Sequence, residues 1–366
     1  MSARRAHPYH ARVPVASQRL WSLVLFAVLP LGFVALTFYA MYSKNAVAID
    51  FHYVYYPAAQ ELLDGNSPFF ENDDPFKRFV YTPLLAVLVA PLTVLPLGVA
   101  DLLVTIALLG LWVATPFVLG IRDWRVVTVT LLWAPFVSAL QTANVTIVLV
   151  FLCALAWHWR DRKVLAGLSI GLAVGLKLFL WPLAFWLLAT RRVLSLVIAS
   201  AVVAFSILVV LPYESLPAFA TRLREHGDLF DEESYTLYAF LVELGAPATA
   251  ARVAWLALGV TVLLLGRRSF SLCLVAALLL SPLVWLHYLT LLVIPLALVS
   301  APLWMWFIPI PLAFADGGAL NGGAGIQTLV LTTFAVIVGL CLWLSRRDDS
   351  VKRRLVGLGR PRPADG

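Results

Sequence analysis

Long apolar segments follow one another along most of this sequence and are separated by short polar loops. The first runs from Trp21 to Tyr42, and about 20 such residues are enough to cross the ~30 Å hydrocarbon core of a bilayer. We count thirteen apolar segments between residues 21 and 345. Backbone polar groups find no water inside a bilayer, so continuous apolar segments of this kind fold there as helices. The sequence therefore predicts a bundle of membrane helices.

The composition agrees with a polytopic membrane protein rather than a soluble domain that carries one anchor. The 366 residues are 61% hydrophobic and 13% charged, whereas soluble domains are about 45–50% apolar and about 25% charged. The first apolar segment is too long for the core of a signal peptide, and no small-residue cleavage site follows it. We therefore expect it to stay in the protein as the first span.

The net charge of +7 raises the question of nucleic-acid binding, but its distribution favours another explanation. Lysines and arginines gather at the two ends of the chain and in short loops, which is the pattern of cytoplasmic loops in membrane proteins. We therefore interpret the charge as topological and expect no nucleic-acid partner. The residues concerned are Arg4, Arg5, Arg12, Arg19, Arg160, Arg162, Lys163, Arg191, Arg192, Arg267, Arg268, Arg346, Arg347, Lys352, Arg353 and Arg354.

Basic clusters at both ends place both ends in the cytoplasm, and this requires an even number of crossings. At least one of the thirteen segments is therefore not a full span, and we predict an all-α polytopic membrane protein with about 12 membrane segments. Residues 164–190 are one candidate, because two full spans need roughly 40 residues and Pro182 interrupts the helix. We expect a short hairpin or re-entrant pair there. The distribution of charge does not decide on which side of the membrane residues 122–125 lie.

The predicted organisation is one membrane domain between two tails. Residues 1–19 and 346–366 are basic, contain prolines and bury little apolar area, so we expect disordered cytoplasmic tails. The domain covers residues 20–345. Two long polar loops, 44–80 and 212–249, are expected together on the non-cytoplasmic side.

The familiar signatures of several other enzyme classes are missing from the sequence. It has no P-loop, GxGxxG, HExxH or Gly-x-Ser-x-Gly pattern. Cys153, Cys273 and Cys341 lie in apolar segments without metal or redox spacing, and we interpret them as packing residues. No cofactor and no metal site are expected. The absence of an internal repeat counts mildly against transporters built from inverted repeats.

Asp50 is an acid placed just past the first span, directly before the aromatic-rich residues 51–56. Aromatic rings prefer the depth of the membrane surface, and a charge so close to hydrocarbon is costly and usually has a task or a partner. We interpret Asp50 as the catalytic carboxylate of a membrane enzyme that acts on a lipid-linked substrate. The alternative is that Asp50 caps a short surface helix, which aspartate favours.

Five local patterns in a fixed order resemble those of one enzyme family. They are residues 50–59 continuing to Phe69, residues 79–85 leading into 90–92, residues 141–144, residues 166–177 followed by Pro182, and residues 281–288. In this order they resemble glycosyltransferase family 87, the polyprenyl-phosphate-mannose-dependent mannosyltransferases of the GT-C fold class. The resemblance covers residues 20–345.

This resemblance implies a GT-C-type bundle in the plasma membrane. The implied reaction transfers a hexose, with mannose favoured, from a polyprenyl-phosphate donor to a lipid or glycan acceptor on the non-cytoplasmic side, without a nucleotide sugar or an obligatory metal. A base within about 2.6–3.2 Å of the acceptor hydroxyl would activate it. Phosphate is already a good leaving group, so the second carboxylic acid of glycoside hydrolases is not needed. Direct displacement would invert the anomeric configuration, with Asp50 as the base.

Other polar residues are candidates for the same site, each with a structural alternative. Lys177 stands in an otherwise apolar helix, Ile170 to Leu180, where its ammonium group should face a cavity or a partner. The structural alternative for Lys177 is that its long side chain snorkels to the membrane interface. The structural alternative for His287 is an interfacial residue without a role in binding. Amides commonly join helices, and basic and aromatic residues commonly meet headgroups. The predicted donor-phosphate residues are Lys177, His287 and Arg78, and the predicted sugar or acceptor residues are Tyr53, Tyr81, Gln141, Asn144 and Tyr235.

Two other function classes stay open at this point. A transporter or flippase for a lipid-linked sugar would use Asp50 and Lys177 as a charge relay across the bilayer. A catalytic Asp50 and His287 must instead share one face of the membrane. A non-catalytic assembly subunit is the second alternative, and it predicts that Asp50→Asn leaves activity intact.

Overall fold

The computed structural model describes residues 15–44, 46–70, 72–315 and 323–358. Within those ranges the chain is helical and contains no strand, which confirms the all-helical prediction. The α-helices are α1 (Val15–Leu23), α2 (Leu29–Ser43), α3 (Tyr56–Leu63), α4 (Pro83–Val89), α5 (Leu97–Val118), α6 (Trp124–Thr130), α7 (Ala134–Gln141), α8 (Thr146–His158), α9 (Lys163–Leu176), α10 (Pro182–Ala189), α11 (Val193–Leu208), α12 (Leu216–Phe230), α13 (Leu237–Glu243), α14 (Ala248–Gly266), α15 (Phe270–Leu280), α16 (Val293–Leu298) and α17 (Gly323–Leu358).

Short 3₁₀ and π segments join these helices and interrupt several of them. They are η1 (Val24–Val28), η2 (Phe51–Tyr55), η3 (Pro75–Lys77), η4 (Ala90–Val94), η5 (Leu178–Leu180), η6 (Leu286–Leu292), η7 (Leu303–Phe307) and η8 (Ile310–Ala315). Such segments mark places where the regular hydrogen-bond ladder is broken. Five of them, η2, η3, η5, η6 and η8, contribute residues to the wall of the candidate site described below.

Four helices in the described ranges are long and apolar enough to cross a membrane: Arg19–Ser43, Leu97–Val118, Ala248–Gly266 and Gly323–Arg347. The pair α7 and α8 passes the same test together, but it is bent by 119°. The remaining apolar helices have 10–17 residues. A membrane protein is therefore supported, whereas the number of about 12 membrane segments stays a prediction, because most apolar segments are too short to cross alone.

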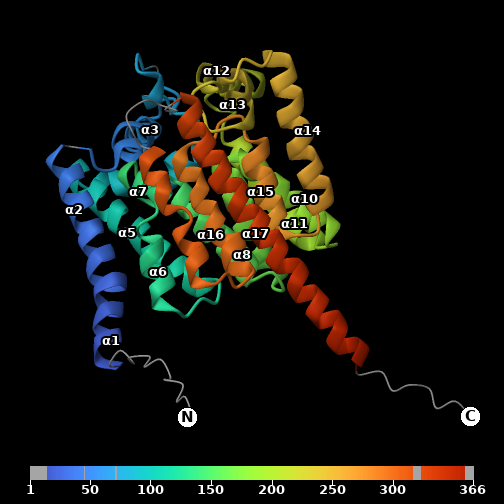
Figure 1. Cartoon of the computed structure of the whole chain (residues 1–366). Helices are drawn as coiled ribbons and strands as arrows, with labels where there is room; N and C mark the ends of the chain where they lie inside the picture. The colour runs from blue at the N-terminus through green and yellow to red at the C-terminus, as the bar shows by residue number, and fades with distance from the viewer. Residues whose placement is uncertain (1–14, 45, 71, 316–322, 359–366) are drawn as a thin grey trace, which may run out of the picture.

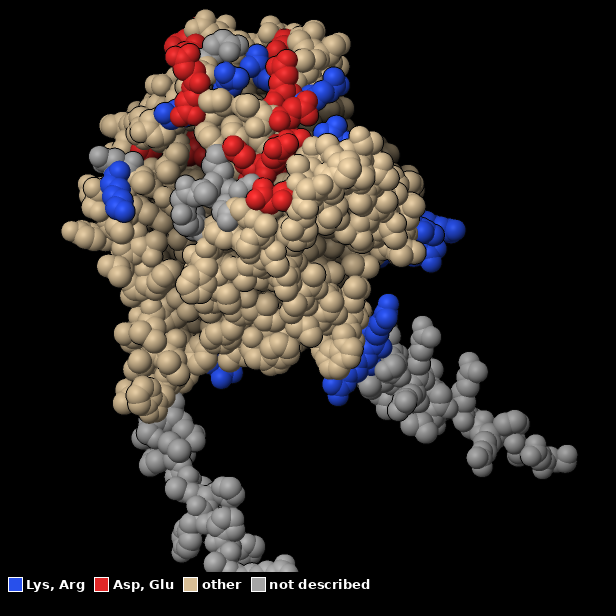
Figure 2. Space-filling view, turned by 45° about the horizontal axis from the view of Figure 1, so that its top comes forward, with Lys and Arg blue, Asp and Glu red and all other residues tan. Residues whose placement is uncertain are grey.

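The two long polar segments lie together at one end of the bundle. Figure 1 places α3, α12 and α13 at the end opposite to the start of α1 and the end of α17. Ring contacts join the two segments, with centroids 5.6 Å apart for Phe69 and Phe219 and 4.5 Å apart for Phe76 and Phe230. Acidic and basic side chains gather at this end, above a wide uncharged band (Figure 2).

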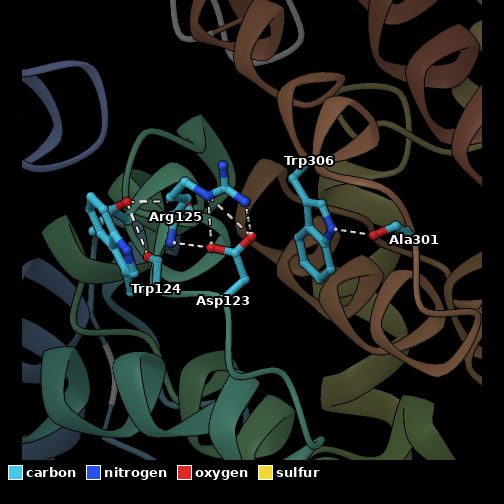
Figure 3. Close-up of polar contacts among 6 residues, drawn as sticks. Asp123, Trp124, Arg125, Ala301 and Trp306 are labelled. Carbon is cyan, nitrogen blue, oxygen red and sulfur yellow. Dashed lines mark hydrogen bonds and ion pairs between the residues drawn. The ribbon is translucent and has the colours of Figure 1, made fainter. Parts of the chain in front are cut away.

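The turn at residues 122–125 lies at the other end of the bundle. Its neighbour Val118 accepts a hydrogen bond across 3.1 Å from His158 Nδ1, next to the basic cluster that begins at Arg160. Asp123 accepts hydrogen bonds from both the backbone N–H and the guanidinium of Arg125 and so caps α6. Figure 3 shows this pair beside Trp306, whose indole N–H donates to Ala301 O at 3.1 Å. The structure therefore places this turn at the same end of the bundle as the basic cluster that begins at Arg160. The distribution of charge alone had not decided this.

The prediction of two disordered tails is wrong for part of each tail. Helix α1 already begins at Val15, and α17 continues to Leu358. Adding residues to an existing helix avoids the costly nucleation step, so the helices extend past their apolar segments. The rest of each predicted tail, residues 1–14 and 359–366, lies outside the described residues.

Glycines at every fourth position allow α9 and α11 to pack closely. Gly167, Gly171 and Gly175 lie on one face of α9. A Cβ atom added at Gly171 would lie 2.7 Å from Val202 Cβ and 3.0 Å from Ala199 Cα. Small residues with this spacing let membrane helices approach at backbone distance. Gly175 O also accepts a 2.7 Å hydrogen bond from Thr82 Oγ1, which fixes the start of α4 beside the end of α9.

Gly171→Leu is therefore expected to destabilise the fold. The new side chain meets the backbone of α11, and overpacking of this kind costs about 1–3 kcal/mol or more. The measurement is the thermal unfolding midpoint of the purified protein in detergent. Gly110→Leu in α5 is the matched control, because a Cβ atom there meets nothing within 4 Å. A midpoint for Gly171→Leu as high as that of the control would contradict the packing argument.

Candidate active site

The chain breaks its helix at Lys177, and this break positions the lysine. Helix α9 ends at Leu176, Lys177 is extended (φ −149°, ψ 105°), and α10 starts at Pro182. Lys177 therefore does not lie inside a helix from Ile170 to Leu180, as the sequence had suggested. Pro182 has no N–H for the carbonyl of residue 178 and its ring would clash there, so a regular helix cannot continue through this stretch. The predicted interruption of segment 164–190 is confirmed.

A second break, between α7 and α8, positions Asn144. Helix α7 ends at Gln141, and Ala143 then adopts a left-handed conformation with φ 47°. Non-glycine residues rarely adopt this conformation, and such strain gathers at functional sites. The carbonyl of Thr142 in this break accepts the backbone N–H of Asp50 at 2.8 Å. The break therefore holds Asp50 and Asn144 next to each other.

The carboxylate of Asp50 is held by a short chain of hydrogen bonds. Its Oδ2 accepts from Asn144 Nδ2 at 2.6 Å. Asn144 Oδ1 in turn accepts from the backbone N–H of Thr146 at 2.9 Å and from its hydroxyl at 2.5 Å. These two donors orient the amide so that its NH₂ group points at the carboxylate. Asp50 makes no side-chain capping bond to η2, so the helix-cap interpretation does not hold.

The ammonium group of Lys177 lies between two aromatic rings. It is 4.0 Å from the centroid of Tyr288 and 5.4 Å from that of Tyr81. Phe179 stacks on Tyr288, with ring centroids 5.0 Å apart, and so supports one wall of this arrangement. Tyr55 O–H donates to Tyr81 Oη at 3.1 Å and supports the other. Aromatic faces attract cations, so the lysine is held in the site rather than turned toward an interface.

His287 has a ring nitrogen that forms no hydrogen bond with any described residue. Its side chain is buried, and its Nε2 has no hydrogen-bond partner among the described residues. Buried polar atoms are normally hydrogen-bonded, and an exception in a cavity wall indicates a place for a ligand atom. His287 therefore does not behave as a plain interfacial aromatic residue.

The candidate site is a cavity of about 620 Å³, within the range of about 300–1,000 Å³ that is usual for small-molecule sites. The cavity lies between the breaks at Lys177 and Asn144, the 281–288 segment and the apolar face of α12. Seven of the predicted site residues line it: Asp50, Arg78, Tyr81, Asn144, Lys177, Tyr235 and His287.

The structure does not bring Tyr53 and Gln141 into this cavity wall. Ser138 and Thr142 line the cavity from this part of the chain, whereas Gln141, the last residue of α7, is not part of its wall. Tyr53 is 41% exposed, and its ring lies 5.0 Å from the ammonium of Lys77. The two residues share a motif with site residues but do not line the cavity.

Several cavity residues were missed as individual site candidates from the sequence, among them His226, Trp285 and Tyr288. Trp285 and Tyr288 flank His287, and this adjacency was the available signal. His226 lies outside the spans on α12, where burial, and then the charges of Lys177 and Arg78, lower its pKa to about 4. The imidazole is therefore neutral near pH 7 and close to both cations. No local pattern around His226 indicated this.

Asp50 lies outside the spans but in a largely dry setting. Burial raises the pKa of its carboxyl, and the hydrogen bond from Asn144 and the charge of Lys177 partly oppose that rise. A carboxylate whose pKa is raised is a better proton acceptor. Among the described residues, no group of three or more His, Cys, Asp or Glu side chains could hold a metal ion.

Comparison with known proteins supplies the family. The family model described as "Glycosyltransferase family 87" matches residues 79–273, which is more than half of the chain. The chain belongs to this family. It is therefore a glycosyltransferase, and the matched range includes Tyr81, Asn144 and Lys177, whereas Asp50 and His287 lie outside it.

One curated relative of this family 87 glycosyltransferase comes from Mycolicibacterium smegmatis (strain ATCC 700084 / mc(2)155). It is named polyprenol-phosphate-mannose-dependent alpha-(1-2)-phosphatidylinositol pentamannoside mannosyltransferase. The two sequences are 28% identical over 359 residues, which cover 86% of this chain and 83% of the relative. No solved structure matches the chain.

Proposed function

We propose that this protein is an integral-membrane mannosyltransferase that takes mannose from a polyprenyl-phosphate donor and transfers it to a hydroxyl of a lipid or glycan acceptor. Membership of the family and the name of the relative support the donor and the sugar. The observation that carries the proposal is the cavity in which the Asp50–Asn144 pair and Lys177 meet. It combines a proton acceptor with a cation that suits a phosphate.

In the proposed reaction Asp50 accepts the proton of the acceptor hydroxyl. The acceptor oxygen then forms a bond to the anomeric carbon while the bond from that carbon to the phosphate oxygen breaks. Polyprenyl phosphate leaves with the electron pair of that bond, and the anomeric configuration inverts. The hydrogen bond from Asn144, 2.6 Å from Asp50 Oδ2, orients the carboxylate for this step.

The phosphate of the donor is proposed to lie against Lys177, His287 and Arg78. All three line the cavity. Contacts with two aromatic rings hold the ammonium group of Lys177 in position, so its charge is available to the negative leaving group. The unsatisfied Nε2 of His287 can donate to a phosphate oxygen. Tyr81 and Tyr235 are proposed to contact the sugar or the acceptor.

The proposed location of the reaction is the non-cytoplasmic side of the plasma membrane. The cavity is lined by residues of both polar segments, such as Arg78 and His226. Helices α3 and α12 of these segments lie at the end opposite to the start of α1 and the end of α17 (Figure 1). Basic loops favour the cytoplasmic side. The predicted division into one domain, residues 20–345, and two cytoplasmic tails belongs to the same proposal.

The alternative functions receive less support from this arrangement. A relay for transport would place its charges in steps across the bilayer, whereas Asp50, Lys177 and His287 line one cavity. An assembly subunit would not need a buried carboxylate beside a cation, because burying a charge is costly.

Transfer of labelled mannose tests the proposal. Purified protein in detergent is given synthetic polyprenyl-phosphate-mannose and a membrane lipid extract, and labelled product is separated by chromatography. We expect a labelled glycolipid from this donor and none from a nucleotide-linked mannose. Transfer only from the nucleotide sugar, or from no mannose donor at all, would overturn the proposed function.

Asn144→Leu is expected to change the pH dependence of transfer. The Asn144 hydrogen bond lowers the pKa of Asp50, so its loss raises that pKa further. A base is active when deprotonated, so the acid limb of kcat/KM moves to higher pH. At pH values below the pKa of the base, a rise of one in that pKa lowers kcat/KM about tenfold relative to the wild type. Thr146→Val keeps Asn144 and should move the limb less. An unchanged pH profile in Asn144→Leu would separate Asn144 from Asp50.

A further inference from the structure

A second cavity of about 660 Å³ lies beside the first and shares part of its wall. Arg78, Val80 and His226 line both cavities. The remaining lining of the second cavity comes from α12 and from Glu214, two residues before that helix, outside all the candidate spans. These residues are Glu214, Ala218, Thr221, Arg222, Glu225 and Leu229.

Helix α12 separates the two cavities by presenting a different stripe to each. Ala218, Arg222 and Glu225 follow one another at steps of three and four residues and face the second cavity. Phe219 and Leu223 form the neighbouring stripe and face the first cavity. Side chains three and four apart share a face of a helix. His226 lies at the boundary of the two stripes and touches both cavities.

The chemistry of the two cavities differs in the way that two different substrates would need. Leu178, Phe179 and Trp181 give the first cavity an apolar side that suits a lipid chain. The second cavity carries two guanidinium groups, two carboxylates and a hydroxyl, with the ion pair of Arg222 and Glu214 at 3.2 Å in its wall. Planar groups that donate and accept in fixed directions suit the many hydroxyls of a sugar.

We propose that the second cavity is the acceptor subsite and binds a polyhydroxylated glycan headgroup, whose reacting hydroxyl reaches Asp50 between Arg78 and His226. This inference rests on the proposed function. In an inverting displacement the acceptor oxygen enters opposite to the leaving phosphate, so donor and acceptor must approach from different sides. The apolar cavity supplies one side and the polar cavity the other.

Bulky substitutions on α12 test the assignment. Ala218→Trp and Thr221→Trp add volume to the second cavity, whereas Ala220→Trp is the matched control on a face of the same helix that lines neither cavity. All three positions are exposed. The probes are octyl α-mannoside as acceptor and synthetic polyprenyl-phosphate-mannose as donor, with both substrates varied separately and thermal unfolding midpoints recorded.

We expect each cavity variant to raise the KM for octyl mannoside by about tenfold, with the donor KM changed less than about twofold, because lost binding of one substrate appears in its own KM. The Ala220→Trp control should match the wild type. Unchanged acceptor KM in both folded cavity variants would overturn the acceptor subsite, and a raised donor KM would assign the cavity to the donor instead. Wild-type protein that transfers to neither octyl mannoside nor a lipid extract would overturn the proposed function itself.

Discussion

Asp50→Asn is expected to abolish mannosyl transfer while the protein stays folded. Asparagine has the shape of aspartate but cannot accept a proton from the acceptor hydroxyl, and general base catalysis contributes about 10²–10⁴ in rate. The neutral side chain can still accept the hydrogen bond that Asn144 donates across 2.6 Å. Because burial raises the pKa of Asp50, the charged form is disfavoured in the fold, so removing the charge should not lower the unfolding midpoint.

The measurement is transfer of labelled mannose by purified wild type and variant, at equal protein and with unfolding midpoints as the fold check. Asp64→Asn is the matched control, because Asp64 is an exposed acid of the same polar segment and does not line the cavity. We expect a loss of at least about 10³-fold for Asp50→Asn alone, within the range of general base effects. Equal transfer by all three proteins would remove Asp50 from the chemistry and overturn the proposed mechanism.

Lys177→Met is expected to have the second largest effect. Methionine keeps much of the length of the side chain but removes the charge, which we propose neutralises the donor phosphate. Loss of one cation that stabilises developing negative charge costs about 10²–10³ in kcat. The donor KM should rise as well, because the phosphate of the bound donor also faces this charge. The charge of Lys177 lowers the pKa of Asp50, so the acid limb of activity should move to higher pH.

Separate KM values for donor and acceptor are the informative measurement for this variant. Lys77→Met is the control, since Lys77 lies in the same polar end but pairs with Asp74 across 3.1 Å outside the cavity. A donor KM for Lys177→Met equal to that of the wild type, with an unchanged pH profile, would show that the lysine serves packing against Tyr81 and Tyr288 only. Asp50→Asn, by contrast, should leave the donor KM unchanged, and this difference separates the two roles.

The sequence by itself determined the class of fold and much of the candidate site. Hydropathy requires helices because a bilayer offers the backbone no other partner. Pro182 requires a helix break near Lys177 because it lacks an N–H. The cost of an acid beside hydrocarbon singled out Asp50. Each of these inferences depends on a residue and its immediate surroundings, which a sequence displays directly.

Only the tertiary structure decided which of these residues meet. Asn144 and Asp50 are 94 positions apart, and the strained break at Ala143 brings them into contact. The tertiary structure also leaves Gln141 out of the cavity wall and brings in His226, which no local pattern had indicated. Helical period predicts which face a side chain occupies but not which helix lies opposite that face. The opposite helix is selected by close packing, as between α9 and α11, and that depends on the whole bundle.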